Sequence, residues 1–165
     1  MASITFKGSN VNTSGYLPVA GTKAPDFTLT TTALSDVTLK SFVGKKVVLN
    51  IFPSLDTPVC ANTVRKFNEI ASKKKDVIVI CISDDLPFAH QRFCVAEKID
   101  NVIFASEMRN KSFGQNYGIR ITNSVLEGLL ARAVLVIDET GRIKHSQLVT
   151  EITDEPDYDA VLSYL

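Results

Sequence analysis

Cys60 is the residue of this 165-residue chain best placed to do chemistry. It follows Thr57 and Pro58 at the point where a polar loop gives way to a helical pattern. Proline is favoured in the first helical turn, so Thr57 is expected to be the N-cap, with its hydroxyl accepting a first-turn N–H. The free N–H groups and the helix dipole at that end favour a nucleophilic thiolate at Cys60. The alternative is a buried structural cysteine, because free cysteine is among the most buried residue types.

Two further cysteines, Cys81 and Cys94, bound what a reactive Cys60 could do next. Cys81 lies in an apolar run and is expected to be inert core, whereas Cys94 lies in the second half of a predicted helix. Three cysteines do not make the disulfide framework of a small secreted domain. None of them forms a C-x-x-C pair, so neither a zinc ribbon nor a thioredoxin-type dithiol is indicated.

The elements on either side of Cys60 would hold it at the edge of a sheet. Residues 47–52 are apolar and rich in β-branched side chains, which predicts a buried strand that ends before Pro53. A helix is predicted from residue 58 to the lysines at 73–75, where positive charge suits the C-terminal dipole. Its apolar face is expected to consist of Val59, Thr63, Phe67, Ile70 and Ala71.

The rest of the chain predicts one mixed sheet with helices on both faces. Further strands are expected at residues 26–30, 37–39, 77–82, 102–105, 133–138 and 143–149, and further helices at 87–97, 111–117 and 157–165. Residues 119–130 fit no element clearly, although 126–130 could form one helical turn. Residues 1–20 are expected to be an appended β-hairpin in which residues 4–6 pair with 16–19. The order of elements indicates a single α/β domain over residues 1–165, with Cys60 at the carboxyl end of a strand, where open α/β sheets carry their chemistry.

The composition is that of an ordinary globular protein. Eighteen basic residues balance eighteen acidic ones, so nothing predicts binding to nucleic acid or to a membrane surface. The apolar runs are too short to span a bilayer, and the first residues lack the apolar core of a signal peptide, so a cytoplasmic protein is expected. His90 and His145 are expected to face solvent, and no metal-ligand cluster is visible.

The segment PSLDTPVC, residues 53–60, resembles the Pro-x-x-x-Thr-x-x-Cys motif of peroxiredoxins. Three further segments resemble the thiol peroxidase branch of that family: VRKFNEIA at 64–71, SDDLPFAHQRFC at 83–94 and LLARAVLVID at 129–138. The four motifs agree in order and spacing, and the likeness extends from about Gly21 to the C-terminus. The resemblance implies a thioredoxin-like fold, which agrees with the predicted order of elements.

The resemblance also implies roles for individual residues. Cys60 would be the peroxidatic nucleophile, and Thr57 and Arg132 would donate to the peroxide oxygens, where charge develops in the transition state. Pro53 would shield the thiol from bulk water. Each has a simpler alternative: a strand terminator for Pro53, an N-cap for Thr57 and a solvated charge for Arg132.

The same resemblance assigns Cys94 as the resolving cysteine, which would condense with the Cys60 sulfenic acid to an intramolecular disulfide. No cysteine follows Cys94, so the arrangement with a C-terminal resolving cysteine is not expected. Hydrogen peroxide and organic hydroperoxides would be the substrates, thioredoxin the reductant, antioxidant defence the role, and a homodimer the assembly, with no metal or organic cofactor. Disulfide geometry requires the two Cα atoms to lie within about 7 Å, so local unwinding around one or both cysteines is expected.

Two other functions share the predicted fold. A thioredoxin-like dithiol reductase or isomerase would need a second cysteine three residues after Cys60, and Thr63 occupies that position. A binding module without enzymatic activity would use Cys60 only as a structural residue. A Cys60 that reacts with peroxide no faster than free cysteine would favour the binding module.

Overall fold

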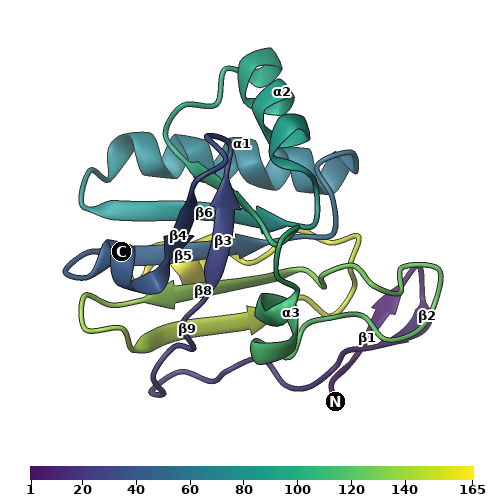
Figure 1. The fold of residues 1–165 in the computed structure, drawn as a ribbon. Helices are drawn as coiled ribbons and strands as arrows, with labels where there is room; N and C mark the ends of the chain where they lie inside the picture. Colours follow the sequence, from purple (N-terminus) through teal and green to yellow (C-terminus); the bar gives the residue numbers. More distant parts are fainter.

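The centre of the molecule is a mixed sheet of seven strands (Figure 1). The structure, a computed structural model, describes all of residues 1–165. The strands of the sheet are β3 (Thr28–Thr31), β4 (Asp36–Thr38), β5 (Lys46–Ile51), β6 (Val77–Ser83), β7 (Ile103–Ser106), β8 (Ala133–Ile137) and β9 (Ile143–Leu148). They lie in the order β4-β3-β7-β6-β5-β8-β9, in which only β5 with β6 and β6 with β7 are parallel pairs. The predicted mixed sheet is therefore confirmed.

Helices cover both faces of this sheet (Figure 1). They are the 3₁₀ helix Leu39–Phe42, α1 (Pro58–Lys73), α2 (Pro87–Glu97), α3 (Ser112–Asn116) and α4 (Tyr158–Leu162). Because successive side chains of a strand point to opposite faces, β5 contributes to two cores. Leu49 and Ile51 pack in the core that contains Phe113 of α3, whereas Val48 packs in the core that contains Phe67 of α1. None of the helices has the length and apolar composition that a membrane span requires.

Helix α1, which carries Cys60, follows the predicted pattern closely. It begins at Pro58 and ends at Lys73, two residues before the predicted end. Its buried residues are Cys60, Thr63, Val64, Phe67, Ile70 and Ala71. The prediction of Val59 on this face was wrong, since Val59 is half-buried and Val64 takes the inner position. The buried face fixes the rotation of the helix, and this rotation turns Cys60 toward the sheet.

The N-terminal hairpin is present, but its second strand differs from the predicted one. Strand β1 (Ser3–Phe6) pairs with β2 (Ser9–Asn12), and residues 16–19 form no strand. The turn consists of Lys7 and Gly8, both with positive φ, at 50° and 77°. Such two-residue turns match the twist of antiparallel strands, so the hairpin closes immediately after β1.

The carboxylate of Glu151 binds this hairpin turn, which gives a testable prediction. It accepts hydrogen bonds from the Thr5 hydroxyl at 2.8 Å and from the amides of Lys7 at 3.0 Å and Gly8 at 3.1 Å. These bonds, that from Thr5 first, lower the pKa of Glu151 to about 2. Because the pKa of Glu151 is lower in the folded than in the unfolded protein, the ionised carboxylate stabilises the hairpin at pH values above the unfolded pKa. This stabilisation is lost as the pH falls from about 4.5 to 2 and the carboxylate is protonated. We expect the protection of the Lys7 and Gly8 amides against hydrogen exchange, relative to the intrinsic exchange rate at each pH, to fall over that interval.

Glu151→Gln is expected to lower the protection of these two amides already at neutral pH, because the side-chain amide has only one acceptor oxygen. Glu127→Gln, a change of an exposed residue on the irregular loop before Arg132, is the matched control and should leave the hairpin amides unaffected. Protection that is independent of pH between 5 and 2 would contradict the prediction.

Two other parts of the chain differ from the prediction. Residues 119–130 contain no helical turn and form an irregular loop that pairs with itself and with the N-terminal segment through bridges at Arg120–Leu130 and Thr13–Ile121. The last helix covers only Tyr158–Leu162, and Asp157 caps it by accepting from the Ala160 amide at 3.0 Å. After Leu162 the chain continues in tighter turns, in which the Tyr164 amide donates to the Val161 carbonyl at 3.1 Å and the Leu165 amide to the Leu162 carbonyl at 3.2 Å.

Both histidines were wrongly predicted to face solvent. His90 is fully buried on α2, with its Nε2 2.9 Å from the Ser83 hydroxyl and its ring against Phe104. His145 is half-buried on β9, where its ring stacks on Tyr164. In each case the imidazole ring packs against an aromatic ring from another element of the fold. The polar neighbours of the two histidines in the sequence could not reveal this contact.

Candidate active site

The loop between β5 and α1 brings the motif residues together before the helix begins. Pro53 is buried directly after the strand, and the chain then turns so that the Thr57 amide donates to the Ser54 carbonyl at 3.4 Å. Thr57 has extended backbone angles and occupies the N-cap position, as predicted. Its hydroxyl makes no capping hydrogen bond to the first turn, so this part of the prediction was wrong. The hydroxyl instead points to Cys60.

The Cys60 thiol is fully buried, yet two polar groups contact its sulfur. The Thr57 Oγ1 lies 2.6 Å from Sγ, and the Arg132 Nη2 lies 3.2 Å from it. A hydroxyl and a guanidinium both donate hydrogen bonds, and both stabilise negative charge on an acceptor. The surroundings of Sγ therefore differ from those of a cysteine buried in hydrocarbon.

Arg132 reaches Cys60 because β8 runs antiparallel to β5. Ile51, the last residue of β5, pairs with Ala133, the first residue of β8, so residue 132 lies beside the loop that follows β5. The Arg132 side chain is only 1% exposed, so the alternative of a solvated charge is wrong. Its Nε donates to the Ile152 carbonyl at 2.8 Å, and its Nη1 is buried without a partner. One donor of the fork is thus free to bind an oxygen beside the sulfur.

The other two cysteines differ in burial and chemistry, and all three thiols are free in the structure. Cys81 is fully buried on β6, where burial raises its pKa to about 12 and Asn50 donates to its sulfur at 3.5 Å. Cys94 is half-buried on α2, and burial also raises its pKa above the usual thiol value. Cys81 is therefore inert at neutral pH, whereas Cys94 can become reactive if its surroundings open.

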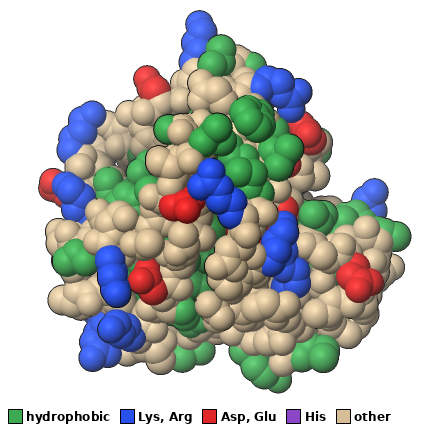
Figure 2. Space-filling view, viewed as in Figure 1, with side chains coloured by type: hydrophobic (Ala, Val, Ile, Leu, Met, Phe, Trp, Pro, Cys, Tyr) green, Lys and Arg blue, Asp and Glu red, His purple; other side chains and the backbone are tan.

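A groove of about 420 Å³ separates the start of α1 from α2. Its lining includes Thr57, Pro58 and Ala61 on one side and Phe93 and Ala96 on the other. Figure 2 shows hydrophobic side chains gathered over this end of the molecule, around α2. The groove is therefore lined by Thr57, the residue whose hydroxyl contacts Cys60.

An ion pair closes this groove on one side. The Arg65 guanidinium on α1 forms two bonds to the Glu97 carboxylate on α2, at 2.9 and 3.0 Å. This pair joins the helices that carry Cys60 and Cys94. The hydrogen bond from Arg65 lowers the pKa of Glu97.

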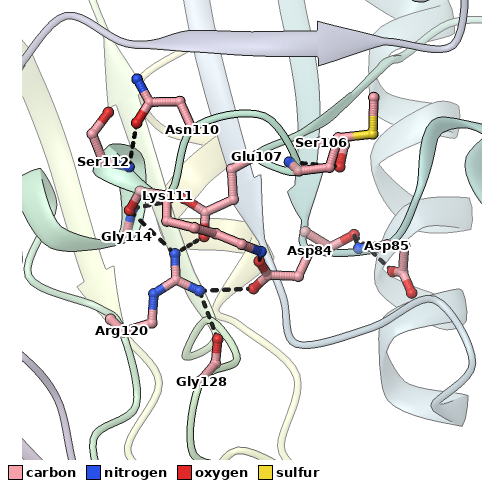
Figure 3. A network of polar contacts seen from close by, with 12 residues as sticks. Asp84, Asp85, Ser106, Glu107, Asn110, Lys111, Ser112, Gly114, Arg120 and Gly128 are labelled. Atoms are coloured by element: carbon pink, nitrogen blue, oxygen red, sulfur yellow. Dashed lines mark hydrogen bonds and ion pairs between the residues drawn. The ribbon is translucent and has the colours of Figure 1, made fainter.

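A buried ionic cluster holds the irregular loop that precedes Arg132 (Figure 3). The Arg120 guanidinium binds the carboxylates of Asp84 and Glu107 and donates to the Gly128 carbonyl at 2.6 Å. Lys111 pairs with the other oxygen of Asp84. Burial raises the pKa of Glu107, although the Gly114 amide and Arg120 favour its charged form. Because Gly128 belongs to the loop, the cluster holds this loop against the segment that follows β6.

Sequence reasoning missed Asp85, which contacts the loop before Cys60. Its carboxylate accepts from the Ser54 hydroxyl and from the Leu55 amide, both at 2.8 Å. Asp85 was covered only by the segment 83–94 that resembles the thiol peroxidase branch, and no role was assigned to it. Its position at the carboxyl end of β6, next to the end of the parallel strand β5, was the available signal, because such ends meet at one edge of a sheet.

Comparisons with known proteins agree along the whole chain. A family model described as Redoxin matches residues 19–162. The chain is 52% identical to a thiol peroxidase of Corynebacterium glutamicum over 165 residues, which are 100% of this chain and 99% of the relative. It is 50% identical to a thiol peroxidase of Mycobacterium bovis, with the same coverage. A solved peroxiredoxin-like protein from Aquifex aeolicus superposes with a TM-score of 0.93 at 39% identity, covering 99% of this chain and 95% of that one.

Proposed function

Because the chain belongs to the redoxin family, in its thiol peroxidase branch and with the thioredoxin-like fold of peroxiredoxins, we propose that Cys60 is the thiol that reduces the hydroperoxide. One observation carries this proposal: the Cys60 sulfur is contacted by both the Arg132 guanidinium and the Thr57 hydroxyl. A structural cysteine needs neither group. A dithiol reductase or isomerase is disfavoured, since no second thiol contacts Cys60.

In the first step, the Cys60 thiolate attacks one peroxide oxygen. An S–O bond forms, the O–O bond breaks, and the sulfur is oxidised while the peroxide is reduced to an alkoxide or hydroxide that takes up a proton. Negative charge grows on the departing oxygen, and donors aimed at it lower the barrier. The unpartnered Nη1 of Arg132 and the hydroxyl of Thr57 are the proposed donors, and the buried Pro53 is proposed to exclude water.

In the second step, the Cys60 sulfenic acid condenses with the Cys94 thiol, which gives a disulfide and releases water. Cys94 is proposed over Cys81 because it is half-buried on α2, the helix whose Phe93 and Ala96 line the groove opposite the start of α1, whereas Cys81 is fully buried on β6. Both Cys60 and Cys94 lie inside formed helices, and a disulfide requires Cα atoms within about 7 Å. We therefore propose that the first turn of α1 or part of α2 unwinds for this step.

In the third step, a dithiol protein of the thioredoxin type reduces the disulfide and is itself oxidised, which returns both thiols. We further propose that the protein works in a reducing compartment such as the cytoplasm and assembles as a homodimer. Its role would be antioxidant defence. None of the three steps uses a metal or an organic cofactor. Hydrogen peroxide and organic hydroperoxides share the O–O bond on which the first step acts, so both belong to the proposed substrates.

Peptide mapping by mass spectrometry tests the proposal directly. One equivalent of hydrogen peroxide added to the reduced protein is expected to give a Cys60–Cys94 disulfide, with Cys81 still alkylatable. In Cys94→Ser, a sulfenic acid on Cys60 is expected to accumulate and to be trapped by dimedone. A disulfide that includes Cys81, or a Cys60 that stays reduced, would refute the assignment.

The raised pKa of Cys94 predicts the pH dependence of the second step. Burial keeps this thiol protonated at neutral pH, and the thiolate is the nucleophile. The rate of disulfide formation is therefore expected to keep rising with pH through the neutral range, by up to about tenfold per unit. Rapid acid quench at saturating peroxide measures this rate, and oxidation of Cys60 in Cys94→Ser is the control. A plateau at pH 7 would argue against Cys94 as the attacking thiol.

A further inference from the structure

The carboxylate of Asp85 joins the loop before Cys60 to the end of β6. It accepts hydrogen bonds from the Ser54 hydroxyl and the Leu55 amide, which belong to the loop before Cys60, both at 2.8 Å. It also accepts a hydrogen bond from the hydroxyl of Ser83, at the end of β6, at 2.7 Å. No basic side chain pairs with Asp85, so its charge is stabilised by these three hydrogen bonds. Hydrogen bonds to an ionised acceptor are stronger than neutral ones.

The Ser83 hydroxyl extends this contact to α2, the helix that carries Cys94. Because it donates to Asp85, it accepts from the Nε2 of His90, 2.9 Å away. His90 is fully buried, and burial lowers its pKa to about 4, so the ring is neutral at neutral pH and its proton lies on Nε2. We name Ser54, Leu55, Ser83, Asp85 and His90 the Asp85 network.

The Asp85 network also reaches the thiol. The Thr57 hydroxyl lies 3.2 Å from the Ser54 carbonyl and 2.6 Å from the Cys60 sulfur. A continuous series of polar contacts thus runs from the sulfur of Cys60 through the loop to Asp85 and on to α2. Loss of the Asp85 contacts would release the loop from the end of β6, where Ser83 also contacts His90 of α2.

We propose that Asp85 is a positioning residue that holds the loop before Cys60 closed for the attack on peroxide and delays disulfide formation with Cys94. This inference rests on the proposed function. Reaction with peroxide needs Thr57 and Arg132 against the sulfur, whereas disulfide formation needs the first turn of α1, which follows this loop, or part of α2 to unwind. A contact present only in the closed arrangement favours the first process over the second.

Asp84 supplies a matched control. It has the same side chain as Asp85 and is adjacent to it, but its carboxylate points the opposite way, into the cluster around Arg120 (Figure 3). Asp84→Asn is expected to lower stability through that cluster without affecting the Asp85 network. It therefore separates a general loss of stability from a specific release of the loop.

The experiment measures two rate constants by rapid quench, alkylation and mass spectrometry. The first is the bimolecular rate constant for oxidation of Cys60 by hydrogen peroxide, measured in proteins that also carry the substitution Cys94→Ser. The second is the rate constant for disulfide formation at saturating peroxide, measured with Cys94 intact. Asp85→Asn keeps the shape of the side chain but removes its charge and one acceptor. Asp85→Asn is expected to lower the rate constant for Cys60 oxidation about tenfold and to raise the rate constant for disulfide formation about tenfold. This is the effect expected from the loss of one charge-assisted hydrogen bond.

Ser54→Ala removes one of the contacts and is expected to shift the ratio of the two rate constants in the same direction by a smaller factor. This variant replaces Asp85→Asn if the latter does not fold. A ratio unchanged in either variant would overturn the inference, as would an equal shift in Asp84→Asn. If the wild-type protein forms no Cys60–Cys94 disulfide, the proposed function itself fails, and the two failures are thereby distinguished.

Discussion

Replacement of Cys60 with serine is expected to abolish peroxide reduction, with kcat/KM for hydrogen peroxide falling by at least about 10³-fold. Serine is similar in size, so the start of α1 and the contacts of Thr57 and Arg132 should persist. Its hydroxyl stays protonated at neutral pH and cannot be oxidised by peroxide. Coupled oxidation of thioredoxin, followed through NADPH and thioredoxin reductase, measures the loss.

The control for this variant is Cys81→Ala, because Cys81 is also fully buried but lies in the middle of the sheet. It is expected to lose stability, since it removes a packed sulfur, while its activity per folded molecule stays within about twofold of wild type. If Cys60→Ser keeps activity, or if Cys81→Ala loses it as completely, the assignment of Cys60 is wrong.

Replacement of Arg132 with methionine is expected to lower kcat/KM for hydrogen peroxide by about 10²–10³-fold, the effect of removing a positioned donor from the transition state. Methionine retains much of the side-chain volume but removes both the charge and the N–H fork. The bimolecular rate constant for oxidation of Cys60 should therefore fall. A competition assay, in which a second peroxidase of known rate constant shares the hydrogen peroxide, measures it. The Ile152 carbonyl would lose its hydrogen bond from Nε, and stability is expected to fall by about 1–3 kcal/mol.

Arg132→Lys separates charge from geometry. Lysine keeps a positive charge but cannot bind Ile152 and the Cys60 region through one planar fork, so we expect activity between that of wild type and Arg132→Met. Arg142→Met is the control, because Arg142 is exposed at the turn between β8 and β9. Equal activities of Arg132→Met and wild type at matched folded fractions would show that the guanidinium does not assist the reaction.

The predictions from sequence were most accurate where local chemistry decides the outcome. The proline at residue 58 and the apolar spacing after it predicted α1, and Pro58 is indeed its first residue. The strand Lys46–Ile51 and the β8–β9 hairpin were predicted to within one residue at most ends. They were least accurate where distant contacts decide: residues 119–130 have no regular pattern because Arg120 and the N-terminal segment hold them.

The sequence by itself therefore determined that Cys60 opens a helix after a buried strand, since propensity, capping and side-chain periodicity act over a few residues. Only the tertiary structure decided what surrounds the sulfur. Arg132 is 72 residues away along the chain and reaches Cys60 through the antiparallel pairing of β8 with β5. Asp85 reaches the loop through the parallel pairing of β6 with β5, and no local rule specifies which strands become neighbours.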